Sequence, residues 1–215
     1  MHKLISGALT FRRHVFGAYR EHFRRLAHQQ EPDTLFITCS DSRMVPNLIT
    51  STDPGDLFVV RNIGNLVPPY SEETTQPMSV GAALEYALNV LDVRFIVLCG
   101  HSGCGAMRAV LQPPSGRLPN VDRWLRTAQE GVELLKEYEP LPDDRSRADL
   151  LSELNVLVQI KHLKTYPAVM RKIEAGTLKL VAWYFEIDGA QLFFYDAETG
   201  QFERLNDESA EKAMR

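Results

Sequence analysis

The sequence lacks the long apolar runs and the excess of positive charge that mark several common classes of protein. Its longest apolar runs, such as FIVLCG and LVAWYF, are far shorter than the roughly 20 residues that a membrane-spanning helix needs. Charges are scattered through the N-terminal stretch, unlike the continuous apolar segment of a secretory signal. With 24 basic and 28 acidic residues, the chain has no general attraction for nucleic acid. These absences predict a cytoplasmic protein that binds neither membranes nor nucleic acid.

Cysteine is also scarce, and its placement excludes two common uses. Three cysteines among 215 residues do not form a disulfide framework, and none lies in the Cys-x-x-Cys pattern of redox proteins. The hydrophobic fraction of 44% is sufficient for a full core, so the chain does not need a metal merely to fold. We therefore expect one domain over residues 1–215, with residues 1–30 as an N-terminal helical arm and a small molecule as the partner.

Strand and helix signals alternate along the first half of the chain. Residues 34–39, 56–62 and 95–100 are short apolar runs typical of buried strands, and residues 79–92 are rich in Ala and Leu, as helices are. This alternation predicts an α/β fold with a mostly parallel central β-sheet flanked by helices.

The remaining segments complete this prediction. Further helices are expected over residues 2–30, 119–138 and 148–176, and a hairpin over residues 178–187 and 191–196. The last helix should bend or break at Pro167 and end at Gly176, and residues 140–147 should be a polar loop. The hairpin should add an antiparallel edge strand to the sheet.

Candidate metal ligands follow two of the predicted strands. Cys39 ends the run TLFITC, and His101 and Cys104 follow FIVLCG. Side chains at the carboxyl ends of parallel strands meet at one edge of the sheet, so these segments can share a site. Two thiolates and one imidazole suit zinc, and three protein ligands leave a fourth position for water, as in catalytic zinc sites. Cys99 lies inside the strand and is expected to be a core residue.

The run CSDSR places a carboxylate and a guanidinium beside the first cysteine. On its own, the pair Asp41 and Arg43 would be interpreted as a local ion pair that holds a loop. Beside a metal, Asp41 could orient a bound water, while Arg43 keeps that carboxylate ionised and away from the metal.

These motifs together resemble those of the β-class carbonic anhydrases. The pattern Cys-x-Asp-x-Arg is met at Cys39, Asp41 and Arg43, and His-x-x-Cys at His101 and Cys104, while PGDLFVVRNIGNLVPPY is also similar. The resemblance implies one Zn²⁺ per chain and the reversible hydration of CO₂ to bicarbonate and a proton by zinc-bound hydroxide. It also implies an α/β fold whose N-terminal helices embrace a partner subunit, giving a dimer or a tetramer built from dimers.

Site roles follow from the resemblance, residue by residue. Cys39, His101 and Cys104 are implied to be the zinc ligands, and Asp41 with Arg43 the catalytic dyad. The implied substrate-contacting positions are Gln30, Phe58, Ile63, Tyr86 and Gly105. Phe58 and Ile63 would serve equally well as core residues, and Gln30 could simply end a helix.

Two departures from the family pattern affect proton transfer and regulation. Val90 replaces a histidine of plant members, so a proton shuttle at that position is absent. Some members bind an inhibitory bicarbonate in a pocket of tryptophan, arginine and tyrosine, positions that align here with Phe36, Arg61 and Phe185. Because two of its three hydrogen-bond donors are missing, we expect no such pocket, and Asp41 should stay paired with Arg43.

Two other functions remain open at this stage. The same zinc site could hydrolyse a related heteroallene, carbon disulfide or carbonyl sulfide. Alternatively, the chain could be a non-catalytic homologue that keeps zinc for structure, although the intact pair Asp41 and Arg43 argues against that alternative.

Overall fold

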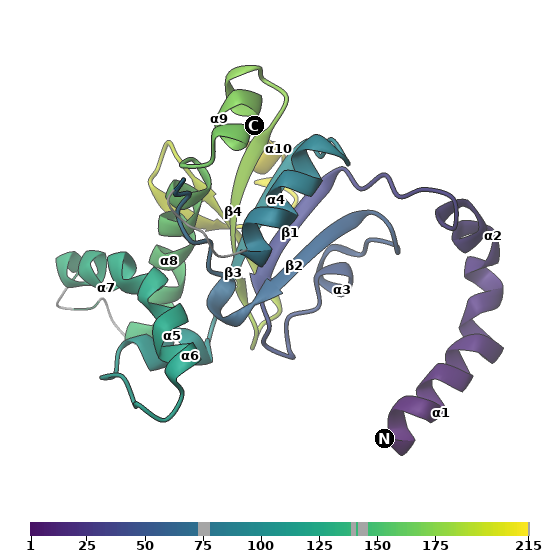
Figure 1. The fold of residues 1–215 in the computed structure, drawn as a ribbon, viewed down its shortest axis with the longest axis horizontal. Helices are drawn as coiled ribbons and strands as arrows, with labels where there is room; N and C mark the ends of the chain where they lie inside the picture. The colour runs from purple at the N-terminus through teal and green to yellow at the C-terminus, as the bar shows by residue number, and fades with distance from the viewer. Residues whose placement is uncertain (73–77, 139–140, 142–145, 215) are drawn as a thin grey trace.

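The computed structural model describes residues 1–72, 78–138, 141 and 146–214, and its centre is one six-stranded sheet (Figure 1). The strand order is β2-β1-β3-β4-β5-β6. The strands are β1 (Thr34–Cys39), β2 (Leu57–Asn62), β3 (Phe95–His101), β4 (Lys179–Glu186), β5 (Gln191–Asp196) and β6 (Gln201–Arg204). The first four in this order are parallel, β5 is antiparallel to β4, and β6 is antiparallel to β5, which confirms the predicted α/β class.

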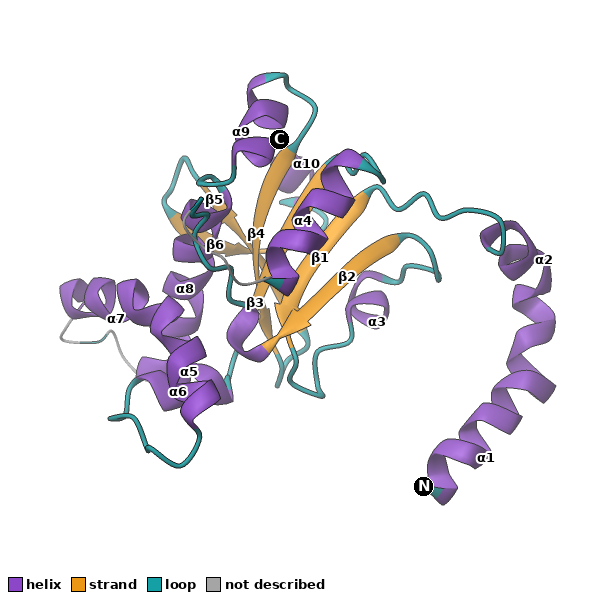
Figure 2. Cartoon of the chain, in the orientation of Figure 1, coloured by secondary structure: helices purple, strands orange, loops and turns teal. Residues whose placement is uncertain are grey.

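Helices pack around the sheet, with α4 across its face, and the first two helices of the chain stand away from it (Figure 2). The α-helices are α1 (His2–Thr10), α2 (Phe16–Leu26), α3 (Pro46–Thr50), α4 (Ser79–Asn89), α5 (Gly105–Val110), α6 (Pro119–Trp124), α7 (Gln129–Leu135), α8 (Arg147–Leu163), α9 (Pro167–Glu174) and α10 (Ala210–Met214). A π-helical turn, η1 (Phe11–Val15), joins α1 to α2, and short 3₁₀ turns are η2 (Ile63–Asn65), η3 (Leu125–Ala128) and η4 (Lys136–Tyr138). None of these helices is both long enough and apolar enough to cross a membrane.

The apolar alternation of the strands divides the core between the two faces of the sheet. One face, with Leu35 of β1 and Leu98 of β3, packs beneath α4, α8 and α9. The other face, with Phe36 and Val97, forms a smaller cluster. A third cluster lies beyond the carboxyl ends of the strands and includes Cys104 with residues of α5, α7 and α8. The last cluster surrounds the edge at which the candidate ligands gather.

The strand register brings the predicted ligand segments together. The chain leaves β1 for β2 on one side and later returns to β3 on the other, so β1 and β3 are neighbours at a switch in strand order. Thr38 pairs with Cys99 across these two strands, and the two carboxyl ends therefore lie side by side. Such switch points are where open α/β sheets bind ligands.

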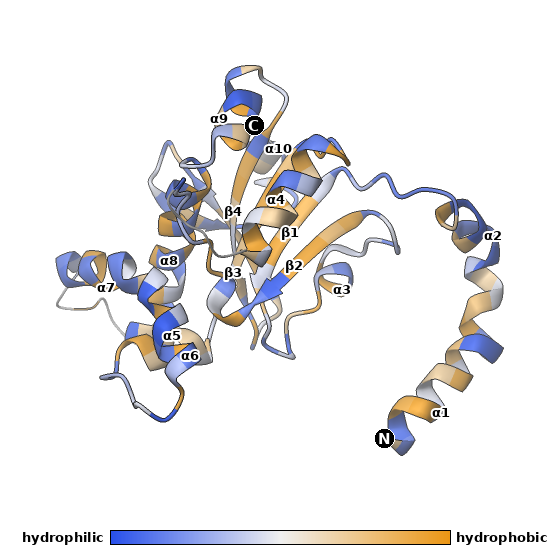
Figure 3. Ribbon diagram, viewed as in Figure 1, coloured by the Kyte–Doolittle hydropathy of each residue, from blue (hydrophilic) through white to orange (hydrophobic). Residues whose placement is uncertain are grey.

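Residues 1–28 of the N-terminal arm lie apart from the sheet (Figure 3). One of its few contacts with the rest of the chain joins His22 Nε2 to Pro54 O at 2.6 Å. None of the residues in α1, η1 or α2 is buried. Even apolar side chains are open to solvent, since Leu4 is 72% exposed and Ile5 57%. An amphipathic arm is confirmed, but this chain alone does not cover its apolar residues.

The structure refines two expectations from the sequence, and a third lies mostly outside the described residues. The antiparallel part of the sheet contains a further strand, β6, beyond the predicted hairpin. The predicted helix is broken at Pro167, as expected: α8 ends at Leu163, and Pro167 occupies the first turn of α9, where a missing N–H costs nothing. The polar loop predicted over residues 140–147 lies mostly outside the described residues.

Candidate metal centre

Three buried side chains converge at the carboxyl ends of β1 and β3. Cys39 is the last residue of β1, His101 is the last residue of β3, and Cys104 immediately precedes α5. The two sulfur atoms and an imidazole nitrogen all lie within 4.8 Å of one another. A tetrahedral zinc ion with Zn–S bonds near 2.3 Å would hold two sulfurs about 3.8 Å apart, so the spacing suits a shared metal ion. The structure therefore brings together the three residues predicted as ligands.

The hydrogen bonding of His101 leaves one ring nitrogen available to a metal. Its Nδ1 lies 2.9 Å from the carbonyl oxygen of Ser102, which requires Nδ1 to carry the proton. Nε2 then holds a lone pair, and among the described residues it is buried without a hydrogen-bond partner. A buried nitrogen with a free lone pair beside two thiols is what a metal ligand set requires.

The thiol of Cys39 lies in a setting that favours the thiolate. The pKa of Cys39 is lowered mainly because the Cys104 thiol donates a hydrogen bond to it. The backbone N–H groups of Asp41 and Gly64 also donate to Cys39 Sγ, each at 3.4 Å. The pKa of Cys104 is correspondingly raised, mainly because its thiol proton is held in the hydrogen bond to Cys39, and also because burial and the neighbouring negative charge disfavour a second thiolate. A bound cation would remove this penalty.

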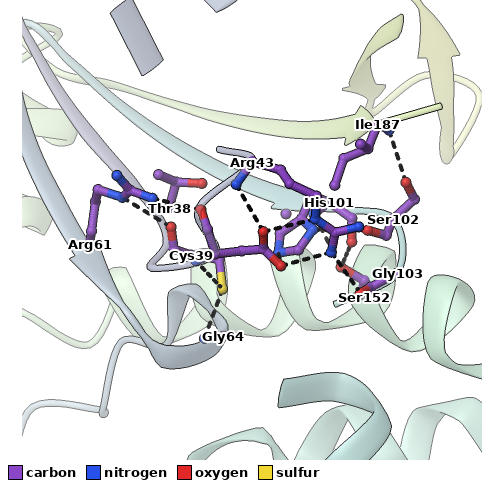
Figure 4. A network of polar contacts seen from close by, with 12 residues as sticks. Thr38, Cys39, Arg43, Arg61, Gly64, His101, Ser102, Gly103, Ser152 and Ile187 are labelled. Atoms are coloured by element: carbon purple, nitrogen blue, oxygen red, sulfur yellow. Dashed lines mark hydrogen bonds and ion pairs between the residues drawn. The ribbon is translucent and has the colours of Figure 1, made fainter. Parts of the chain in front are cut away.

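The Asp41 carboxylate is held by Arg43, which lies close to Cys39 and His101 in Figure 4. Arg43 Nε donates to Asp41 Oδ1 at 2.9 Å and Arg43 Nη2 to Asp41 Oδ2 at 2.8 Å, and Nη2 also donates to Gly103 O at 3.1 Å. The paired guanidinium holds the pKa of Asp41 well below its usual range. Asp41 Oδ2 is 4.0 Å from His101 Nε2, so the ionised carboxylate faces the same space as the imidazole lone pair.

The five predicted substrate contacts fall into two groups in this chain. Ile63 follows β2 and Gly105 begins α5, so both lie near the ligands. Phe58 pairs with Leu35, whereas Asn62 pairs with Cys39, which places Phe58 about 13 Å along the sheet from the metal-site edge.

The other two predicted contacts belong with Phe58. The ring of Tyr86 lies 5.8 Å from that of Phe58 and is 44% exposed. Gln30 precedes β1 and is therefore at the opposite end of that strand from Cys39. A single chain thus does not bring Gln30, Phe58 and Tyr86 to its own candidate ligands.

Two groups hold the backbone of the centre: Arg61, which the sequence analysis considered only as part of an anion pocket, and Ser152, which it did not consider. Arg61 donates to Cys39 O at 3.2 Å and to Asp41 O at 2.7 Å, so its guanidinium fixes the backbone of the segment that carries both residues. Ser152 of α8 donates to His101 O at 2.8 Å. For Ser152 the available signal was a polar residue on the apolar face of a buried helix.

Comparison with known proteins agrees with this geometry. The family model described as Carbonic anhydrase matches residues 34–192. A carbonic anhydrase of Pseudomonas aeruginosa is 40% identical over 215 residues, covering 100% of this chain and 96% of that protein.

Two solved structures share the fold over nearly the whole chain. The β-carbonic anhydrase CcaA superposes with a TM-score of 0.89 at 38% identity, covering 96% of this chain and 92% of that one. A structure from a study of two tetrameric β-carbonic anhydrases of Sordaria macrospora gives a TM-score of 0.76 at 31% identity, covering 95% of this chain and 96% of that one. With the family match over most of its length and this agreement in fold, the chain belongs to the β-carbonic anhydrase family.

Proposed function

We propose that this enzyme uses one zinc ion, held by Cys39, His101 and Cys104, to hydrate CO₂ reversibly to bicarbonate and a proton. The observation that carries the proposal is the cluster of three buried ligand atoms within 4.8 Å of one another, with the Asp41 carboxylate beside it. Two sulfurs and one nitrogen suit zinc better than calcium or magnesium, which prefer oxygen ligands. Three protein ligands leave one tetrahedral position open.

The residues around the centre divide the work of the reaction. When bound, zinc acts as a Lewis acid that lowers the pKa of a coordinated water. Asp41 accepts a hydrogen bond from the reacting water and orients it, and Arg43 fixes that carboxylate through two parallel hydrogen bonds. Because both Asp41 oxygens are engaged by Arg43, Asp41 is kept from binding the metal itself. Ile63 supplies an apolar contact for CO₂.

Asp41→Asn is the variant that tests this role most directly. It should retain one zinc per chain, because Asp41 is not a ligand, but lose most stopped-flow CO₂ hydration, because an amide no longer offers an ionised acceptor. Asp33→Asn is the matched control, since Asp33 precedes β1 at the far end of the strand and pairs with Arg94 at 3.3 Å. Full activity of Asp41→Asn would remove the role assigned to this carboxylate.

We also propose that Asp41 stays paired with Arg43 at neutral pH and that no inhibitory bicarbonate site forms beside it. The Arg61 guanidinium is already engaged by two backbone carbonyls, and the ring of Phe36 lies 6.0 Å from that of Trp183. An anion there would lack an indole donor at position 36 and a phenol donor at position 185, each worth about 1.5–3 kcal/mol to a charged group. Activity should then fall on acidification as a one-proton titration; a steep cooperative profile with bicarbonate inhibition would contradict this.

The proposed functional unit is a dimer, or a tetramer built from dimers. The arm exposes apolar side chains, and Gln30, Phe58 and Tyr86 lie away from the ligands of their own chain, so a second copy is needed to complete the substrate pocket. The tetrameric Sordaria macrospora relatives agree with self-association. Deleting residues 1–28 should give aggregated or inactive protein in sedimentation and activity assays, whereas a soluble active monomer would refute the assembly. Location in the cytoplasm stays a prediction.

A further inference from the structure

One face of α8 carries a continuous row of polar side chains, although the helix is largely buried. Four of them are at most 8% exposed, and the fifth, Asp149, is half-buried. Their spacing of three or four residues places them on one side of the helix, facing the sheet and its loops. This α8 polar row consists of Asp149, Ser152, Asn155, Gln159 and His162.

The first two members of the α8 polar row bind the segment that carries two candidate ligands. Asp149 Oδ1 accepts a hydrogen bond from Gly103 N at 2.6 Å. Ser152 Oγ donates to His101 O at 2.8 Å and accepts from His101 N at 3.3 Å, and Figure 4 shows Ser152 directly beside this segment. The backbone on either side of Ser102 is therefore attached to α8 by side chains and not by regular secondary structure.

The other three members bind the segment after β2. Asn155 Nδ2 donates to Gly64 O at 3.1 Å, Gln159 Oε1 accepts from Val67 N at 2.8 Å, and His162 Nδ1 lies 2.8 Å from Val67 O. Gln159 Nε2 donates to Asn155 Oδ1 at 3.0 Å, which fixes the orientation of both amides. Because Asn155 Oδ1 accepts from Gln159, the Asn155 amide must direct its N–H group at Gly64 O, and the flipped orientation would lose both bonds.

The segment that Asn155 holds is both strained and next to the metal centre. Gly64 and Asn65 have φ angles of 79° and 47°, in the left-handed region that costs a non-glycine residue free energy. Gly64 N in turn donates to Cys39 Sγ at 3.4 Å. Gly64 thus links Asn155 to the candidate ligand, because its carbonyl oxygen accepts from Asn155 and its own N–H donates to Cys39.

We propose that Asn155 is a positioning residue for the metal centre, acting through Gly64 on the Cys39 thiolate. The inference rests on the proposed zinc site. An N–H group directed at a metal-bound thiolate withdraws electron density from the sulfur and fixes its orientation. Because Asn155 is fully buried, solvent does not readily replace its bond to Gly64. Its removal lets the strained segment relax and weakens the N–H···S contact.

The test substitutes Asn155→Leu in the full chain, which keeps the branching at Cγ but replaces the amide with larger methyl groups and so removes the donor to Gly64 O. Zinc affinity is measured by competition with a chromophoric chelator, and the cobalt(II)-substituted protein is examined for its thiolate-to-metal charge-transfer band. We expect affinity to fall about 10–100-fold, as is typical when a group that supports a ligand is lost. The band should move to lower energy, because a thiolate without its N–H donor is oxidised more easily.

Val158→Ala is the control, because Val158 is a buried residue of α8 outside the α8 polar row. It should lower stability while leaving the charge-transfer band and zinc affinity unchanged. If Asn155→Leu does not fold, Asn155→Ala is measured in the same two assays. Wild-type affinity and an unshifted band in the Asn155 variant, or an equal shift in Val158→Ala, would overturn the proposal. A wild-type chain that shows no thiolate–cobalt band would overturn the zinc site itself, and the role of Asn155 with it.

Discussion

Gly100 allows α8 to approach β3 closely, and replacing it with alanine should destabilise the enzyme. A Cβ atom at Gly100 would lie 2.7 Å from Val156 Cγ2 and 3.1 Å from the backbone oxygen of Ser152. Carbon atoms in ordinary contact are about 3.5–4.0 Å apart, so the helix or the strand must move by about 1 Å. Rotation of Val156 offers little relief, because valine in a helix has one strongly preferred rotamer.

The magnitude follows from overpacking in a core that has little free space. Inserting a methyl group into such a contact costs about 1–3 kcal/mol. For a chain of this length, each kcal/mol lowers Tm by about 2–4 °C, so Gly100→Ala should melt about 2–12 °C below wild type. The measurement is thermal or denaturant unfolding at one fixed concentration of protein and of zinc, because self-association and metal binding both shift apparent stability.

A double-mutant cycle separates this contact from a general loss of stability. Val156→Ala removes the nearer clashing atom but leaves the Ser152 oxygen at 3.1 Å, so relief should be partial. The pair should be more stable than the sum of its single effects by about 0.5–3 kcal/mol. Strict additivity, or a Gly100→Ala variant as stable as wild type, would show that the approach of α8 to β3 is looser than this structure has it.

Three further outcomes are expected. Lys212 holds the pKa of Asp196 at about 2, below its ordinary value of 3.8, so the stability difference between wild type and Lys212→Met should be present above about pH 4 and disappear towards pH 2 in denaturant titrations. Chelating the metal should lower Tm by about 5–10 °C relative to protein with zinc at 100 times its Kd, and added zinc should restore it; an unchanged melt would mean that no bound metal supports the fold. Trp124→Phe removes the donor to Ile63 O at 2.7 Å and should cost about 0.5–1.5 kcal/mol in denaturant unfolding.

The elements that position the centre could be predicted because their signals are local. The apolar runs ending at Cys39 and preceding His101 are short, uninterrupted and followed by polar residues, which is typical of buried parallel strands. The two-residue spacing of Asp41 and Arg43 allows a bidentate pair whatever the rest of the fold. The metal ligands could be expected to meet because the carboxyl ends of parallel strands share one edge.

The elements that could not be predicted depend on tertiary contacts. β6 has a sequence, QFER, with one apolar side chain, and it forms by pairing with β5. Asn155 and Gln159 are ordinary polar residues of a helix in sequence terms, since composition does not say whether a polar face meets water or the backbone of another segment. That Phe58 and Tyr86 lie away from the ligands of their own chain could be seen only once the strand register was known.

The α8 polar row also has a consequence for hydrogen exchange and for metal release. Loop amides usually exchange rapidly, but Val67 N and Gly103 N are bonded to Gln159 and Asp149 of α8. The Val67 amide can exchange only when α8 separates from it, because Gln159 is fully buried and bonded to Asn155, and that opening also breaks the contacts of α8 with β3. The Val67 amide should therefore exchange hydrogen as slowly as the amides of the core. Metal release should likewise require the separation of α8, and not only a local fluctuation of the loops.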